Sequence, residues 1–185
     1  SGAQLMPKLY LAIDNCFAAK RWTRPIEWAR KVRELGLTYI EASADTENDP
    51  LYGGAAYQER WLDEVEAACR ETGARVANLY SGHGTYSTLG LGHTEEDVAE
   101  RLLERWLKPQ VRAAARLGAG LGFYAHAFSI PTLKDPDTYR GARNRLVSRL
   151  AELARYASAT LSAPIGVEQM YAPHQIPWTL EGTRE

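Results

Sequence analysis

Five short apolar segments alternate along the chain with longer amphipathic ones, and this alternation limits the possible folds more than any other feature. The apolar segments have the length and composition of buried strands and comprise residues 9–15, 38–43, 75–81, 121–127 and 164–170. The longer segments repeat apolar residues at three- and four-residue spacing, which predicts helices at 25–35, 57–72, 94–117 and 135–160. Pro109 is expected to kink the third helix. Alternation of this kind predicts an α/β protein with a parallel sheet.

No linker, low-complexity stretch or shift in composition divides the chain, so residues 1–185 are expected to form a single domain. The alternation suits a parallel barrel of the TIM type, here partial, with about five of its eight β–α units, because a complete barrel needs about 250 residues. An open doubly wound parallel sheet is the alternative and fits the length better. Residues 13–23, after the first strand, lack the glycine-rich phosphate turn of nucleotide-binding sheets.

Charge and composition exclude several classes of partner. The net charge is −1, and no long block of Lys and Arg is present, so a nucleic-acid partner is not expected. No apolar run reaches the ~18 residues of a membrane span. Cys16 and Cys69 lie far apart and outside any CxxC motif, as is typical of reduced thiols in a cytoplasmic protein. We therefore expect a cytoplasmic protein that binds neither nucleic acid nor membrane.

The segment 166–179, GVEQMYAPHQIPWT, contains the most informative carboxylate. Period-two alternation places Gly166, Glu168 and Met170 on one face of the fifth strand, and Ile165 and Val167 on the face that packs against helices. A carboxylate inside a barrel needs a metal or a hydrogen-bonding partner. Glu168 is therefore either a functional residue or a glutamate paired with an Arg or a Tyr hydroxyl.

Two histidines lie at the predicted ends of the third and fourth strands. Enzymes with α/β barrels carry their chemistry at the carboxyl ends of the barrel strands. His126 ends the fourth strand, on the same side as Tyr124, and is either functional or a hydrogen-bonded structural histidine. His83 lies between two glycines, which allow the backbone to approach a ligand closely, and a turn histidine is the alternative.

Further polar and aromatic residues lie at or near the same strand ends. Glu41 lies inside the second strand, where a carboxylate is costly unless it is paired. His174 and Trp178 lie in the loop after the fifth strand and are expected to line a pocket, although His174 is equally compatible with a solvated loop. The acidic segment 44–56 is expected to be a loop that forms a lid or a substrate wall. Residues 45–56 and 128–136 are expected to choose the substrate.

The order and spacing of these strand-end residues resemble the xylose isomerase-like barrels. That group contains sugar-phosphate isomerases and epimerases, ketose 3-epimerases, inosose dehydratases and zinc-dependent apurinic-site endonucleases. The resemblance covers essentially the whole chain as the first five of eight β–α units. The segment VEQMYAPHQIPWT is similar to a subgroup described as sugar-phosphate isomerases or epimerases, which leaves the substrate open.

The resemblance implies a divalent metal, Mn²⁺, Mg²⁺, Co²⁺ or Zn²⁺, held by carboxylates and a histidine from strands five to eight. Glu168 matches the ligand on strand five, which in the epimerases also exchanges the proton next to the substrate carbonyl. His126 and His83 match positions that contact the substrate in the isomerases and bind zinc in the endonucleases. Strands six to eight lie outside this sequence, so the chain would supply only one of the usual ligands.

The expected function is that of a metal-dependent isomerase or epimerase that acts on a small sugar, keto-sugar or sugar phosphate by proton abstraction next to a carbonyl. Glu168, His126 and His83 are its expected catalytic residues, with Glu168 also the metal ligand. The expected substrate contacts are Glu41, Tyr124, His174 and Trp178.

Three alternatives stay open. A dehydratase or decarboxylase of a keto-sugar acid would use the same fold and the same initial proton abstraction. A non-catalytic fragment or ligand-binding partial barrel is compatible with the length. An apurinic-site endonuclease is less favoured, since the charge is nearly neutral.

The edges of a five-stranded partial barrel would be open at its first and fifth strands. Open edges promote association unless another chain or segment covers them. We therefore expect either that a stable form of these residues is a homo-oligomer, or that the native protein continues beyond Glu185.

Overall fold

The computed structural model describes residues 9–161 and 164–184, and its centre is one parallel sheet of five strands. The strands are β1 (Ala12–Asp14), β2 (Tyr39–Ser43), β3 (Arg75–Ser81), β4 (Gly120–Phe123) and β5 (Ile165–Val167). They lie in the order β1-β2-β3-β4-β5, each parallel to its neighbours. Sequential order is that of a TIM barrel, whereas a doubly wound sheet reverses its order at a switch point. The prediction of a partial TIM-type barrel is therefore confirmed.

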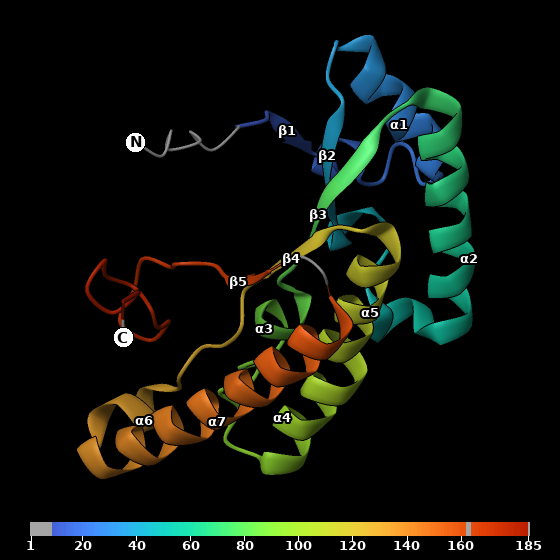
Figure 1. The fold of residues 1–185 in the computed structure, drawn as a ribbon. Helices are drawn as coiled ribbons and strands as arrows, with labels where there is room; N and C mark the ends of the chain where they lie inside the picture. Colours follow the sequence, from blue (N-terminus) through green and yellow to red (C-terminus); the bar gives the residue numbers. More distant parts are fainter. Residues whose placement is uncertain (1–8, 162–163, 185) are drawn as a thin grey trace, which may run out of the picture.

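The long helices lie on one side of the row of strands, as Figure 1 shows for α1, α2 and α5. These helices are α1 (Pro25–Glu34), α2 (Pro50–Thr72), α5 (Lys108–Leu117) and α7 (Pro136–Thr160). Shorter elements complete the connections: α3 (His83–Tyr86), α4 (Glu96–Leu102), α6 (Ile130–Lys134), the 3₁₀ turns η1 (Asn15–Ala18) and η2 (Ala44–Thr46), and the π-helical turn η3 (Leu103–Leu107). Within the described ranges, no helix is long and apolar enough to cross a membrane.

The two faces of the sheet differ in character. Ile40, Leu79 and Leu121 are buried beneath the helices in the main hydrophobic core. Glu41 and Tyr80, their neighbours along the strands, are only half-buried on the opposite face. In a closed barrel that opposite face would line the interior. The core between sheet and helices is thus formed by the described residues, while the polar face stays open.

A β-bulge at Ala77 sets which side chains of β3 reach the open face. Ile40 is paired with Val76 and Glu41 with Asn78, so one extra residue is inserted in β3. Because of this insertion, Val76 and the later Leu79 both pack toward the helices, although strict alternation would place them on opposite faces.

Helix α2 begins earlier than the sequence pattern predicts, so the expected 44–56 loop is wrong from Pro50 onward. Asp49 caps the helix, since its Oδ1 accepts a hydrogen bond from Leu51 N at 2.8 Å, and Pro50 occupies the first turn. Gly54, with φ +68°, interrupts the regular helix geometry. The connection between β2 and α2 is therefore short.

The predicted distortion near Pro109 is confirmed and takes the form of η3. Lys108 N donates to Leu103 O, a π-helical hydrogen bond. Pro109 has no N–H to donate to the preceding turn, which favours such a local change of helix geometry. Strands β1, β4 and β5 are shorter than predicted. Because β4 ends at Phe123, the prediction that His126 ends this strand is wrong, and His126 lies in the connection that follows.

Candidate functional site

Glu168 and Tyr80 form a pair at the carboxyl ends of β5 and β3. Tyr80 Oη donates a hydrogen bond to Glu168 Oε2, and Tyr86 Oη lies 3.4 Å from the same hydroxyl. Glu168 N donates to Phe123 O at 2.9 Å, which fixes the backbone beside β4. From the sequence, a structural Glu168 is expected to pair with an Arg or with a Tyr hydroxyl. In the structure its hydrogen-bonding partner is a tyrosine, Tyr80.

The Tyr80 hydroxyl is a proton donor over the whole ordinary pH range. Burial raises the pKa of Tyr80, and the hydrogen bond to the Glu168 carboxylate raises it further. A phenol with a raised pKa stays protonated and donates to the carboxylate. The glutamate is therefore held in one orientation, with its second oxygen free of this bond.

Glycines opposite Asn78 and Tyr80 leave space for these side chains on the open face. Gly120 pairs with Asn78, and Gly122 pairs with Tyr80. A Cβ atom at Gly120 would lie 2.8 Å from Asn78 Oδ1, and one at Gly122 would lie 3.2 Å from Asn78 Nδ2. The small residues of β4 thus let β3 present large polar groups beside Glu168.

Glu41 lies on the same face and is electrostatically linked to the pair. Burial raises the pKa of Glu41, and the negative charges of Asp14 and Glu168 raise it further, while a hydrogen bond from Asn78 opposes the shift. Three carboxylates from β1, β2 and the end of β5 therefore share one polar face of the sheet.

His83 lies in α3 after β3, and a row of rings links it to the Glu168 region. Its ring centroid is 5.5 Å from that of Tyr52 and 6.3 Å from that of Tyr86. The Tyr86 ring is in turn 5.6 Å from Tyr124. We call Tyr52, His83, Tyr86 and Tyr124 the aromatic row. Because Tyr86 also approaches the hydroxyl of Tyr80, the row brings the predicted residues His83, Tyr124 and Glu168 to one end of the sheet.

The glycines around His83 serve packing between side chains. A Cβ atom at Gly82 would lie 2.5 Å from the Tyr86 ring, and one at Gly84 would overlap the ring of Trp106. The sequence-based explanation was a close approach to a ligand. The structure instead shows that the two glycines on either side of His83 let the backbone pack closely on the rings of Tyr86 and Trp106.

His126 is enclosed behind the loop that follows β5. Its side chain is 1% exposed, and its Nε2 accepts a hydrogen bond from Ile176 N at 3.0 Å. The Phe128 ring packs on the His126 ring, with 4.9 Å between the ring centroids. The backbone N–H of Phe128 donates a hydrogen bond to His174 O at 2.8 Å. His126 thus anchors the loop, and it does not join the aromatic row.

Burial lowers the pKa of His126 to about 4, and the nearby His174 contributes to the shift. The unfolded chain, with the ordinary histidine pKa of 6.5, therefore takes up a proton first as the pH falls. We expect the His126 contribution to stability to be complete above pH 6.5 and to decrease by roughly 3 kcal/mol as the pH falls toward 4.

His126→Gln tests this expectation, because the glutamine Oε1 can still accept from Ile176 N but does not titrate. Urea unfolding of both proteins at several pH values should show a smaller acid loss in the variant. Equal acid losses in the two proteins would contradict a neutral, buried His126.

Tyr124, His174 and Trp178 differ in position. Tyr124 Oη accepts a hydrogen bond from Gln175 Nε2, which ties the loop to the aromatic row. His174 is partly exposed and contributes its backbone carbonyl to the anchoring of the loop. Trp178 is 43% exposed and lines a pocket of about 260 Å³ between the loop and α7, a pocket that Glu168 does not line.

The described residues do not assemble a metal centre. Across 9–161 and 164–184, no three His, Cys, Asp or Glu side chains are grouped so that they could hold a metal ion. Glu168 is exposed and accepts from Tyr80. The residues present therefore do not by themselves fit a divalent metal.

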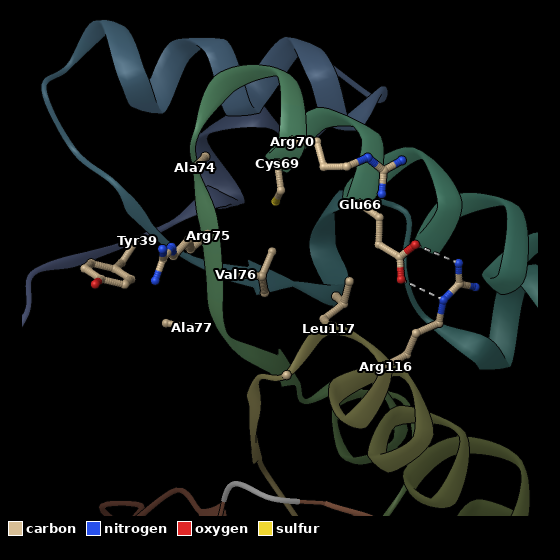
Figure 2. A pocket seen from close by; sticks show the side chains of 11 residues that line it. Tyr39, Glu66, Cys69, Arg70, Ala74, Arg75, Val76, Ala77, Arg116 and Leu117 are labelled. Carbon is tan, nitrogen blue, oxygen red and sulfur yellow. Dashed lines mark hydrogen bonds and ion pairs between the residues drawn. The ribbon is translucent and has the colours of Figure 1, made fainter.

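A second pocket, of about 510 Å³, lies at the opposite, amino-terminal end of β3 (Figure 2). Figure 2 shows Arg116 paired with Glu66 at its rim. Arg116 also contacts Glu59 and Asp63, so its charge is neutralised by α2. Barrel enzymes carry their chemistry at the carboxyl ends of strands, which favours the Glu168 end over this pocket.

Sequence reasoning did not select Tyr80, Asp49 or Gln175 as site residues. Tyr80 binds Glu168, Gln175 binds Tyr124, and the Asp49 carboxylate lies 3.4 Å from His83 Nδ1. The only signal for Tyr80 was its proximity to the end of an apolar strand, and Asp49 reads as an ordinary helix cap before proline.

Comparison with solved structures shows similar folds in proteins that are longer than this chain. A candidate xylose isomerase from Rhodospirillum rubrum aligns with a TM-score of 0.81 and 23% identity over 92% of this chain and 57% of that protein. The 3-keto-D-glucoside 4-epimerase of E. coli aligns with a TM-score of 0.63 and 22% identity over 87% of this chain and 57% of the epimerase. The D-psicose 3-epimerase of Clostridium cellulolyticum, solved with D-tagatose, aligns with a TM-score of 0.62 and 17% identity over 91% of this chain and 55% of that enzyme.

The chain therefore spans a little over half the length of these structures, whose low identity to it shows the fold alone. No protein of curated function matches the chain. The model of the xylose isomerase-like TIM barrel family matches residues 29–183, which is most of the sequence. By this match and by its strand order, the chain belongs to the xylose isomerase-like TIM barrel family.

Proposed function

We propose that this chain forms the first five β–α units of an isomerase or epimerase that acts on a small sugar, keto-sugar or sugar phosphate. The observation that carries the proposal is the Tyr80–Glu168 pair at the carboxyl end of the sheet. The similarity of the fold to two sugar epimerases agrees with it. The reaction proposed is removal of the proton from the carbon next to a carbonyl group.

Glu168 is the proposed base. Its Oε2 accepts from Tyr80, so Oε1 is the oxygen that takes the proton from carbon. Delivery of a proton to the opposite face of the same carbon gives the epimer and needs a second acid on that face. Return of the proton from Glu168 to the former carbonyl carbon, with transfer of the adjacent hydroxyl proton to the carbonyl oxygen, gives the isomer. Tyr80 stays protonated because burial raises its pKa, and it holds the carboxylate in place through both steps.

The aromatic row is the proposed substrate wall. The faces of Tyr52 and Tyr86 are apolar surfaces on which the C–H face of a sugar can lie, and both residues are exposed. His83 lies between these rings and can exchange hydrogen bonds with a sugar hydroxyl. Glu41, half-buried on the same face, is the proposed second polar contact.

A divalent metal is part of the expectation from the family, and one similar structure, from Mycobacterium smegmatis, is a complex with magnesium. When bound, such a metal polarises carbonyl and hydroxyl oxygens. Here Glu168 offers one carboxylate, and the described part of the chain groups no three metal-binding side chains. A metal at Glu168 would need ligands from outside the described residues.

Deuterium exchange tests the proposal on the intact protein. Ketoses and their phosphates are incubated with it in D₂O, with and without added Mn²⁺ or Mg²⁺, and followed by ¹H NMR. The expected result is loss of the signal of the proton next to the carbonyl, together with growth of an epimer or isomer. A dehydrated or decarboxylated product, or no exchange with any sugar of the panel, would overturn the assignment.

A further inference from the structure

A buried carboxylate lies directly behind His83. Asp49 is 3% exposed, and its Oδ2 lies 3.4 Å from His83 Nδ1. That nitrogen is itself buried and makes no hydrogen bond of good geometry within the described structure. Unpaired polar atoms are costly inside a protein, so a buried nitrogen that faces a buried carboxylate needs an explanation.

Asp49 is held in place from two sides. Its Oδ1 accepts from Leu51 N at 2.8 Å, which caps α2, and its Oδ2 accepts from Ser81 Oγ at 2.9 Å. Ser81 Oγ in turn accepts from Nε1 of the fully buried Trp106 at 2.8 Å. Since the serine oxygen accepts the hydrogen bond of the indole N–H, the serine hydroxyl donates its own hydrogen bond to Asp49. The carboxylate is therefore oriented by the core.

The other ring nitrogen of His83 faces a different environment. Its Nε2 lies 2.7 Å from Asp45 Oδ1, and the Asp45 side chain is 51% exposed. Tyr52 and Tyr86 flank the ring, and both are exposed. One nitrogen thus faces a fixed, buried carboxylate, and the other faces a solvated carboxylate that a substrate can displace.

We propose that Asp49 is a positioning residue for His83: its carboxylate accepts the Nδ1 proton and so directs Nε2 toward a substrate hydroxyl that takes the place of Asp45. The inference rests on the proposed function for the identity of that hydroxyl. Burial raises the pKa of Asp49, and the hydrogen bonds from Leu51 and Ser81 oppose this shift. Those two donors favour the ionised form that the role requires.

Asp49→Asn is the informative variant because it separates the helix cap from the contact with His83. The asparagine carbonyl can stay on Leu51 N, so α2 remains capped. Its NH₂ group then faces His83 Nδ1 and donates where the carboxylate accepted. The variant should therefore remove the proton from Nδ1 and leave one on Nε2, where the Asp45 carboxylate accepts it at 2.7 Å.

Long-range ¹H–¹⁵N NMR of the histidine rings reports which nitrogen carries the proton, in the absence of any substrate. His83 is assigned by its missing signals in His83→Gln, since the chain has only 4 histidines. We expect a protonated Nδ1 in the wild type and in the matched control Asp45→Asn, and an unprotonated Nδ1 in Asp49→Asn. The same protonation pattern in all three proteins would overturn the inference.

Kinetics supply the second measurement. If Asp49 positions His83, Asp49→Asn should lower kcat for sugar exchange by up to about 10²-fold with little change in KM. A variant with normal kcat and a changed ring proton would overturn the positioning role. If no sugar is turned over by the wild type while the ring proton still moves, the proposed function fails and the Asp49–His83 contact stands.

Discussion

Replacing Trp106 by alanine should lower the free energy of unfolding by about 3–5 kcal/mol, the usual loss when a buried tryptophan is truncated. Trp106 is fully buried in the core between the sheet and the helices, so its removal leaves a large cavity there. Its indole also donates to Ser81, which would lose that partner inside the protein. The ring is moreover the surface on which Gly84 rests, so the turn that carries His83 should loosen.

Urea unfolding followed by far-UV circular dichroism measures this effect without relying on tryptophan fluorescence. Trp178→Ala is the matched control, because that side chain is 43% exposed and should cost much less. Trp106→Phe fills most of the volume but cannot donate to Ser81, and it should fall between the two. Equal losses for Trp106→Ala and Trp178→Ala would show that Trp106 is not a core residue.

Replacing Glu168 by glutamine should lower the rate of deuterium exchange next to the substrate carbonyl by about 10²–10⁴-fold, the usual contribution of a general base. The glutamine has the same shape, and its carbonyl oxygen can still accept from Tyr80, so the fold should not change. What it lacks is a basic oxygen to receive the proton from carbon. KM should change little, since the proposed substrate contacts are the aromatic row and Glu41.

Glu100→Gln is the control. Glu100 is exposed on α4, and its substitution removes one negative charge, as Glu168→Gln does, at a position outside the proposed site. Its exchange rate should equal that of the wild type. Both variants should keep the wild-type circular dichroism spectrum. Full exchange activity in a folded Glu168→Gln protein would exclude Glu168 as the base.

The alternation in the fifth strand predicted its two faces correctly from residues alone. Ile165 and Val167 pack against the core, and Gly166 is exposed on the other face. Gly122 pairs with Gly166 across β4 and β5. Period-two reasoning works here because the described strand is short and regular, so that each residue simply alternates.

The same reasoning fails in β3, and the reason is the bulge at Ala77. Counted from Val76, which faces the helices, strict alternation turns Tyr80 toward the helices as well. The inserted residue reverses the faces of all later positions, so Leu79 is buried and Tyr80 meets Glu168. A bulge is set by pairing with the neighbouring strand, and nothing in RVANLYS marks it.

His126 and Asp49 show a second limit. The sequence pattern predicts His126 at the end of a strand and so in the site, but β4 ends at Phe123. The surroundings of His126 depend on Ile176 and His174, which lie some fifty residues later. Asp49 looks like a helix cap, and it is one. Its contact with His83 arises only because β2 and β3 are neighbours in the sheet. Contacts of this kind depend on packing between distant segments.

The one-sided covering of the sheet has a consequence for how such a chain can change during evolution. Successive residues of a strand are under different constraints. Leu79 and Leu121 must pack under the helices, whereas Tyr80 and Gly122 lie on the polar face. Substitutions on the polar face leave the hydrophobic layer intact, so they can be sampled one at a time without unfolding the protein. The fold can therefore diversify its specificity while its scaffold drifts slowly.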